Sequence, residues 1–167
     1  PDVFGDDRGF FMETWRAEDF KQQVADIDFI QDNHSKSGQG VLRGLHYQIQ
    51  HPQGKLVRVV LGEAFDVAVD IRKQSPTYGR WVGTCLNADN KEMLWVPPGF
   101  AHGFYVLSAE VELIYKCTDY YFPEYDRSIK WDDPDIGINW PLLNGEPPVL
   151  SEKDQHGQAF KTAEVYP

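Results

Sequence analysis

The sequence is poor in cysteine, in basic residues and in long apolar runs. Its 167 residues include 2 cysteines, Cys85 and Cys117, which lie in apolar strand-like stretches without the spacing of metal ligands. We therefore expect two buried free thiols, as is typical of a reducing compartment, and a cytoplasmic location. No stretch approaches the roughly twenty apolar residues that a membrane span requires, so we expect no membrane partner.

The charge balance argues against a polyanionic partner. The chain has 26 acidic and 16 basic residues and a formal net charge of −10. Such a charge repels polyphosphate in general, and the sequence shows no basic stripe that would overcome the repulsion. We expect no nucleic-acid partner. The length is that of one ordinary domain, so we expect residues 1–167 to form a single domain.

Short strand-like runs dominate the middle of the chain. Leu56–Leu61 and Ala64–Ile71 flank Gly62-Glu63, which is a candidate for a two-residue hairpin turn. In the second run, alternation predicts one face in the core and the other either wet or lining a site. Further strands are predicted at Arg80–Leu86, Met93–Val96, Gly103–Leu107 and Val111–Thr118. Many short strands at even spacing predict a sandwich or jelly roll.

The two ends of the chain carry the expected helices. Residues 18–24 have early acidic residues and two apolar residues four apart, which predicts one short amphipathic helix. The tail from about residue 122 is rich in proline. We expect it to wrap the barrel irregularly until a short helix after Leu150.

Several segments share their residues with one known family. They are Asp6-Asp7-Arg8-Gly9-Phe10-Phe11, Gln31-Asp32-Asn33-His34-Ser35, Leu42-Arg43-Gly44-Leu45-His46, Gln53-Gly54-Lys55-Leu56-Val57-Arg58, Phe65-Asp66-Val67-Ala68-Val69-Asp70, and the stretch from Pro97 to Phe104. On these segments the chain resembles the dTDP-4-dehydrorhamnose 3,5-epimerases, in register from about Val3 to Asp154. Members usually carry another strand ahead of Val3, which this sequence does not include.

The resemblance implies both a fold and an activity. The fold is all-β, a cupin-type jelly-roll barrel with a few short peripheral helices. The activity is epimerisation at C3 and C5 of a dTDP-linked 4-keto-6-deoxyhexose, by an isomerase that uses no cofactor and forms a homodimer. Relatives on the same scaffold that epimerise only C3 or only C5, or that shift the keto group, remain open, as does a non-catalytic protein that binds sugar nucleotides.

The histidine pattern bears on metal binding. Cupin barrels often hold a metal with a His-x-His pair, a glutamate and a further histidine. Here Gln48 stands two residues after His46, and His102 alone follows in the Pro97–Gly103 segment. Two histidines without a third ligand make a poor metal site, so we expect none and disfavour a metal-dependent oxygenase.

Four residues are candidates for the chemistry. His46 is a candidate base because imidazole titrates near neutral pH, although from the residues alone a buried structural histidine is equally compatible. The resemblance implies that Asp154 orients His46, Lys55 stabilises an enolate and Tyr115 donates a proton. Ser151 and Asp154 also fit a helix cap, Lys55 fits a solvated turn, and Tyr115 fits ordinary strand packing.

The resemblance also implies a set of substrate contacts. Arg8, Arg43 and Lys153 would meet the diphosphate, since arginine forks and lysine point charges suit phosphate. Tyr121 would stack on the base. The other implied contacts are Glu13, Gln31, Asp32, Asn33, Lys55, His102 and Asp126, the last an aspartate where glutamate is common. Arg43 and His46 are three apart and would face opposite sides of a regular strand, so either Gly44 marks a bulge or Arg43 serves a neighbouring subunit.

Overall fold

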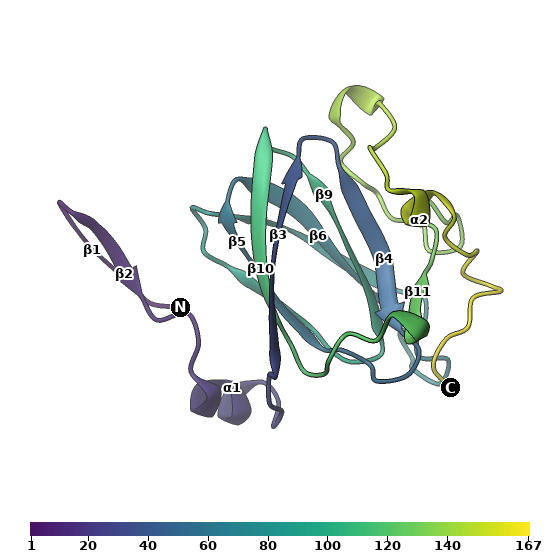
Figure 1. Ribbon diagram of the computed structural model, residues 1–167, viewed down its shortest axis with the longest axis horizontal. Helices are drawn as coiled ribbons and strands as arrows, with labels where there is room; N and C mark the ends of the chain where they lie inside the picture. Colours follow the sequence, from purple (N-terminus) through teal and green to yellow (C-terminus); the bar gives the residue numbers. More distant parts are fainter.

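Two antiparallel sheets form the body of the molecule, a computed structural model that describes residues 1–167 (Figure 1). The four-stranded sheet has the order β3 (Gln31–Gly38), β10 (Glu110–Cys117), β5 (Lys55–Leu61) and β8 (Met93–Val96). The five-stranded sheet has the order β11 (Asp126–Ser128), β4 (Leu42–Gln48), β9 (Phe100–Val106), β6 (Glu63–Asp70) and β7 (Trp81–Asn87). The fold is a cupin-type jelly-roll barrel, as predicted. No helix is both long and apolar enough to span a membrane.

The predicted hairpin at Gly62-Glu63 is wrong. The chain does turn there, at Gly62 with φ of 75°, but β5 pairs with β10 and β8 whereas β6 pairs with β9 and β7. The turn therefore carries the chain from one sheet to the other. A short glycine turn specifies a reversal of direction, but the pairing depends on which surface each strand buries. Crossing between sheets lets Val59 and Ala64 meet in one core cluster.

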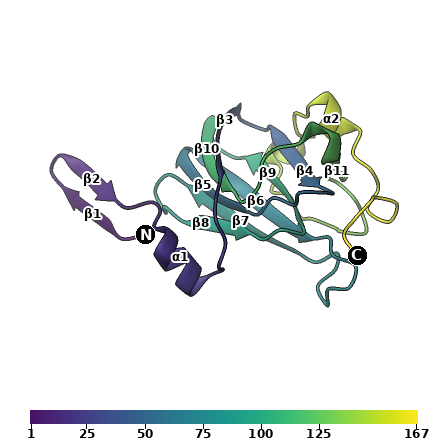
Figure 2. The ribbon, with the colours of Figure 1, turned by 60° about the horizontal axis from the view of Figure 1, so that its bottom comes forward.

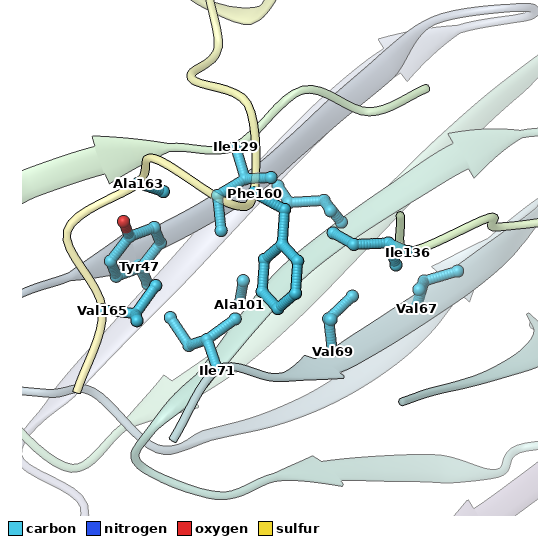
Figure 3. Packing of buried hydrophobic residues seen from close by; sticks show 11 residues of the cluster. Tyr47, Val67, Val69, Ile71, Ala101, Ile129, Ile136, Phe160, Ala163 and Val165 are labelled. Carbon is cyan, nitrogen blue, oxygen red and sulfur yellow. The ribbon is translucent and has the colours of Figure 1, made fainter. Parts of the chain in front are cut away.

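Apolar packing occurs on both faces of the five-stranded sheet. The cluster between the sheets includes Val57, Phe104 and Leu113. A second cluster lies on the outer face, where Phe160 and other residues of the C-terminal tail cover Val69 and its neighbours (Figure 3). Strand β6 is therefore buried on both sides, and the face expected to be wet or to line a site points into the barrel, where Asp66 pairs with His102.

The tail from residue 122 wraps the barrel, as predicted (Figure 2). It contains the short helices η1 (Pro123–Tyr125), η2 (Leu143–Gly145) and α2 (Glu152–Gln155). Its last residues clasp β4, since the Tyr47 hydroxyl donates to the carbonyl of Glu164 and the Tyr166 hydroxyl donates to the carbonyl of Gln48. The tail is thereby bonded to the strand that carries His46.

The first residues form an arm rather than part of either sheet. Strands β1 (Val3–Asp6) and β2 (Gly9–Met12) pair only with each other and project away from the barrel (Figure 1). Phe4, Phe10 and Phe11 on this arm are 65%, 60% and 69% exposed. Helix α1 (Ala17–Gln23) follows, as predicted, and buries Phe20.

The two cysteines differ in exposure. Cys117 is buried on β10, as expected. Cys85 is exposed, contrary to the prediction, because β7 is the edge strand of its sheet and Cys85 faces outward there. An apolar run was therefore an insufficient guide to burial at a sheet edge.

Strand β4 is irregular at Gly44, as one of the two sequence interpretations required. Arg43 pairs with Phe104 and His46 with His102, so two residues of β4 oppose Gly103 alone. Gly44 has φ of 128°, and a Cβ there would lie 2.5 Å from the Cα of Gly103. Only glycine fits this approach of two backbones.

We expect Gly44→Ala to lower the free energy of unfolding by about 2–5 kcal/mol, through combined backbone strain and overpacking. Gly38→Ala is the matched control, because a Cβ at Gly38 meets nothing within 4 Å and its φ is not in the left-handed region. Urea unfolding measures both. Equal stability of the two variants would contradict the proposed role of Gly44.

Candidate active site

One cavity lies between the two sheets, where β4 and β5 bring titratable side chains together. Its volume is about 360 Å³. The lining residues come from both sheets and from the tail. They are Gln31, Asn33, His46, Tyr47, Gln48, Gln53, Lys55, Tyr115, Tyr121, Asp126 and Lys153.

The structure brings Asp154 to His46, as the resemblance implied. Asp154 Oδ1 lies 2.5 Å from His46 Nε2 and also accepts from the backbone N–H of Gly44 at 3.3 Å. Asp154 Oδ2 accepts from the Ser151 hydroxyl at 2.6 Å, and Ser151 caps α2 by accepting from the Asp154 N–H. The paired and capping interpretations are therefore both satisfied, each through different atoms of Asp154.

The pair fixes the charge state of each partner. Burial lowers the pKa of His46 below its ordinary value of 6.5, although the hydrogen bond to Asp154 acts in the opposite direction. Burial opposes ionisation of Asp154, but the hydrogen bonds from His46 and Ser151 outweigh it and hold the pKa of the carboxyl below its ordinary range. At neutral pH His46 is neutral, its side chain is 29% exposed toward the cavity, and Asp154 is ionised.

Lys55 and Tyr115 approach the cavity from the sheet opposite His46. Burial lowers the pKa of Lys55, and the nearby Cys117, Asp126 and Asp66 groups partly oppose this change. Burial raises the pKa of Tyr115, so its hydroxyl keeps its proton at neutral pH. An imidazole on one sheet thus faces a protonated phenol and a lysine amine on the other.

The mouth of the cavity carries a linked trio. The Tyr121 hydroxyl donates to Asp126 Oδ2 at 3.1 Å, and the Lys153 ammonium forms an ion pair with the same oxygen. The interaction joins the tail helix α2 to β11 and to the segment after β10. A phosphate entering here would meet Lys153 at the rim.

Arg43 reaches across the barrel. Its Nε donates to Ser37 Oγ at 2.9 Å and its guanidinium also donates to the carbonyl of Lys36, both on β3. The bulge at Gly44 therefore turns Arg43 toward the four-stranded sheet. Arg43 and His46 can thus both face that sheet in a single chain, although they are three residues apart on β4.

A second buried pair, His102 with Asp66, lies on the strands beside His46. His102 Nε2 is 2.7 Å from Asp66 Oδ1, and Asp66 is 0% exposed. Asp66 Oδ2 is buried without a hydrogen-bond partner. The sequence had indicated His102 but not Asp66, although alternation along β6 placed Asp66 on the inward face. His46 and His102 each pair with a carboxylate, and no group of three or more His, Cys, Asp or Glu side chains could hold a metal.

Five of the predicted contacts do not line the cavity: Arg43 and His102, described above, and Asp32, Arg8 and Glu13. Asp32 points to the outer face of its sheet, where it pairs with Lys116 at 3.0 Å, because Gln31 and Asn33 on either side take the inward positions. Arg8 and Glu13 lie on and just after the arm. Arg8 pairs with Asp6, and Glu13 pairs with Arg16 at 2.9 Å. Tyr47, Gln48 and Gln53 line the cavity but were not predicted as site residues.

A jelly-roll barrel with an imidazole–carboxylate pair facing a tyrosine and a lysine defines a cupin-type enzyme of proton transfer. The family model described as dTDP-4-dehydrorhamnose 3,5-epimerase matches residues 1–162. The chain belongs to this family and is an isomerase.

Individual relatives agree with this membership. The dTDP-4-dehydrorhamnose 3,5-epimerase of Pseudomonas aeruginosa is 56% identical over 168 residues, covering 100% of this chain and 92% of the relative. The crystal structure of the 3,5-epimerase from Legionella pneumophila, in complex with dTDP-4-keto-L-rhamnose, matches with a TM-score of 0.95 and 53% identity over 98% of this chain and 87% of that one. A 3'-monoepimerase from Streptomyces bikiniensis, in complex with dTDP-quinovose, matches with a TM-score of 0.90 and 35% identity over 97% and 82%.

We expect Asp154→Asn to lower the pKa of His46 further, because the variant removes a negative charge and a hydrogen bond that favour the imidazolium. Ser151→Ala leaves the charge in place and should not lower the pKa of His46. NMR titration of the imidazole signals measures both, with the other histidines as internal references. A titration of His46 that stays in place or moves upward would contradict the electrostatic role of Asp154.

Proposed function

We propose that this enzyme epimerises dTDP-4-dehydro-6-deoxy-D-glucose at C3 and C5 to give dTDP-4-dehydro-L-rhamnose. The observation that carries the proposal is the neutral His46, paired with Asp154 and facing Tyr115 from the opposite sheet. Epimerisation needs a base on one face of the sugar and an acid on the other, and the cavity supplies one of each.

His46 acts as the base. The hydrogens at C3 and C5 lie α to the C4 ketone, so their removal as protons gives an enolate. Asp154 holds the imidazole and stabilises the imidazolium that forms. Activity therefore requires neutral His46 and is lost as the pH falls through the lowered pKa of that group.

Lys55 stabilises the enolate. Imidazole is a weak base for a carbon acid, and each unit of pKa mismatch costs about 1.36 kcal/mol. A fixed ammonium beside the C4 oxygen would offset several such units. The nearby Asp66 and Asp126 carboxylates favour the charged form of Lys55 and so oppose the effect of its burial.

Tyr115 returns the proton. Its raised pKa keeps the hydroxyl protonated, and its place on β10 puts it across the cavity from His46 on β4. Delivery to the face opposite the base inverts the carbon. A proton returned by His46 itself would restore the original configuration.

The nucleotide is held at the mouth of the cavity. Arg43 and Lys153 supply positive charge for the diphosphate. Tyr121 is 51% exposed and offers a flat ring for the thymine. Gln31, Asn33, His102 and Asp126 complete the proposed set of contacts around the substrate.

A homodimer would account for the arm and for the two predicted contacts that it carries. Phe4 and Phe11 lie on one face of the arm and Phe10 on the other, and all three are exposed apolar side chains that a second copy would cover. The arm projects away from the barrel (Figure 1) and none of its residues lines the cavity, so Arg8 and Glu13 would serve the partner subunit. Pairing through β1 and β2 would also cover their free edges.

Tyr115→Phe should separate exchange from epimerisation, because it keeps the ring and removes the donor. With the keto sugar nucleotide in heavy water, proton NMR should show the wild type exchanging at both carbons. The variant should lose about 10²- to 10⁴-fold in inversion and much less in exchange. His46→Asn, as comparison, should lose exchange at both carbons by a similar factor.

The outcomes discriminate among activities. Wild-type exchange at one carbon would indicate a C3- or C5-specific epimerase, and exchange at neither would leave a binding protein. Parallel loss of exchange and inversion in Tyr115→Phe would contradict the assignment of Tyr115 as the acid.

Light scattering at micromolar concentration should give the mass of a dimer. Replacing Phe10 and Phe11 together by serine should shift the protein to monomer, since both rings are exposed in a single chain. Val82→Ser is the control, because Val82 is an exposed apolar residue on β7, away from the arm. A wild-type monomer, or a dimer unaffected by the double change, would contradict the proposed interface.

A further inference from the structure

The segment Asp119–Phe122, which carries Tyr121, has almost no backbone pairing of its own. It follows β10 and precedes η1. Its one backbone–backbone hydrogen bond joins the Phe122 carbonyl to the Tyr125 N–H. An irregular segment held so sparsely would be mobile, and a mobile tyrosine makes a poor platform for a base.

Gln48 supplies part of the missing pairing. Its Nε2 donates to the carbonyl of Tyr120 at 3.1 Å, and its Oε1 accepts from the N–H of Phe122 at 2.6 Å. Nε2 also donates to the carbonyl of His51 at 2.7 Å. Gln48 is only 3% exposed, so one buried amide forms hydrogen bonds with the backbone on both sides of Tyr121.

Two more glutamines also form hydrogen bonds with the backbone of this segment. Gln31 Oε1 accepts from the N–H of Tyr121 itself at 3.0 Å, and Gln53 Nε2 donates to the carbonyl of Asp119 at 2.8 Å. Gln31 is braced in turn, since its Nε2 donates to Asn33 Oδ1 at 3.2 Å. Backbone groups at four successive residues are thus bonded by side-chain amides from three different parts of the barrel.

The amides are suited to this task. A glutamine side chain offers both a donor and an acceptor, so it can replace the backbone partner that a sheet would otherwise supply. Removing one partner of a buried hydrogen bond is destabilising, because the other partner stays unpaired. The glutamine hydrogen bonds are therefore strong enough to fix the conformation of the short segment Asp119–Phe122.

Gln48 also connects the two ends of the site. It lies two residues after His46 on β4, on the same inward face, and both line the cavity. Strand β4 therefore carries His46 and, through Gln48, also positions the Tyr121 ring that is proposed to stack on the nucleobase.

We propose that Gln48 and Gln53, together with Gln31, are positioning residues that hold Tyr121 ready to stack on the nucleobase. The proposal rests on the proposed function, since it takes Tyr121 as the thymine platform. Gln48 and Gln53 act through Tyr121. Their contribution should appear in affinity for the nucleotide and should vanish when the tyrosine ring is absent.

The test is a double-mutant cycle on binding of dTDP, measured by calorimetry. Gln48→Met keeps the length and the packing while removing both hydrogen-bonding functions. It should weaken dTDP binding roughly tenfold in the presence of Tyr121, a loss within the range of one base-stacking contact. In a Tyr121→Ala background the same change should have almost no effect on affinity.

Two further variants test whether a loss of affinity arises from misfolding or from the loss of any glutamine hydrogen bond. Gln53→Met removes a single hydrogen bond at a half-exposed position, so it should fold even if Gln48→Met does not, and it should show the same dependence on Tyr121 with a smaller loss. Gln39→Met is the matched control, because Gln39 also donates to a backbone carbonyl, that of Leu107 at 3.0 Å, but does not line the cavity. It should leave dTDP affinity unchanged.

Each outcome is decisive. If the wild type fails to bind dTDP, the proposed function falls and the positioning role falls with it. If the wild type binds but the glutamine variants lose affinity equally with and without the Tyr121 ring, or lose none, the positioning role is overturned while the proposed function stands.

Discussion

The carboxylate of Asp154 is the constraint on which the site depends. A buried charge must be met by hydrogen-bond donors, and this one has three in His46, Gly44 and Ser151. Those donors belong to β4 and to the start of α2, so satisfying one carboxylate docks the tail helix against the barrel. The same contact sets the orientation of the imidazole, which ties the stability of the tail to the chemistry.

The division of the site between two sheets follows from the path of the chain. The glycine turn after β5 sends β6 into the opposite sheet, which leaves Lys55 and Tyr115 on one wall and His46 on the other. Packing on both faces of the five-stranded sheet makes the wall behind His46 rigid. The groups that we propose to act on opposite sides of an enolate are therefore separated by the architecture, not by the flexibility of any side chain.

Much of the fold was predictable because alternation and turn residues are local signals. The strands from β5 to β10, the helix α1 and the wrapping tail were all expected, and so was the bulge at Gly44 as one of two interpretations. Alternation could also have excluded Asp32, which lies between two inward residues. The predictions of a hairpin at Gly62 and of a buried Cys85 were wrong, because both features depend on which strands lie next to each other in a sheet. The glutamine contacts to residues 119–122 depend on the closed barrel, so no local pattern indicated them.

The separation of His46 and Asp154 in the sequence, 108 residues, has a consequence for the newly made chain. During synthesis the histidine leaves the ribosome long before its carboxylate partner exists. A chain that ends between Tyr115 and Asp154 contains His46, Lys55 and Tyr115 but lacks the carboxylate that pairs with His46. The order of translation thus withholds the carboxylate partner of His46 until the strands of both cavity walls have been made.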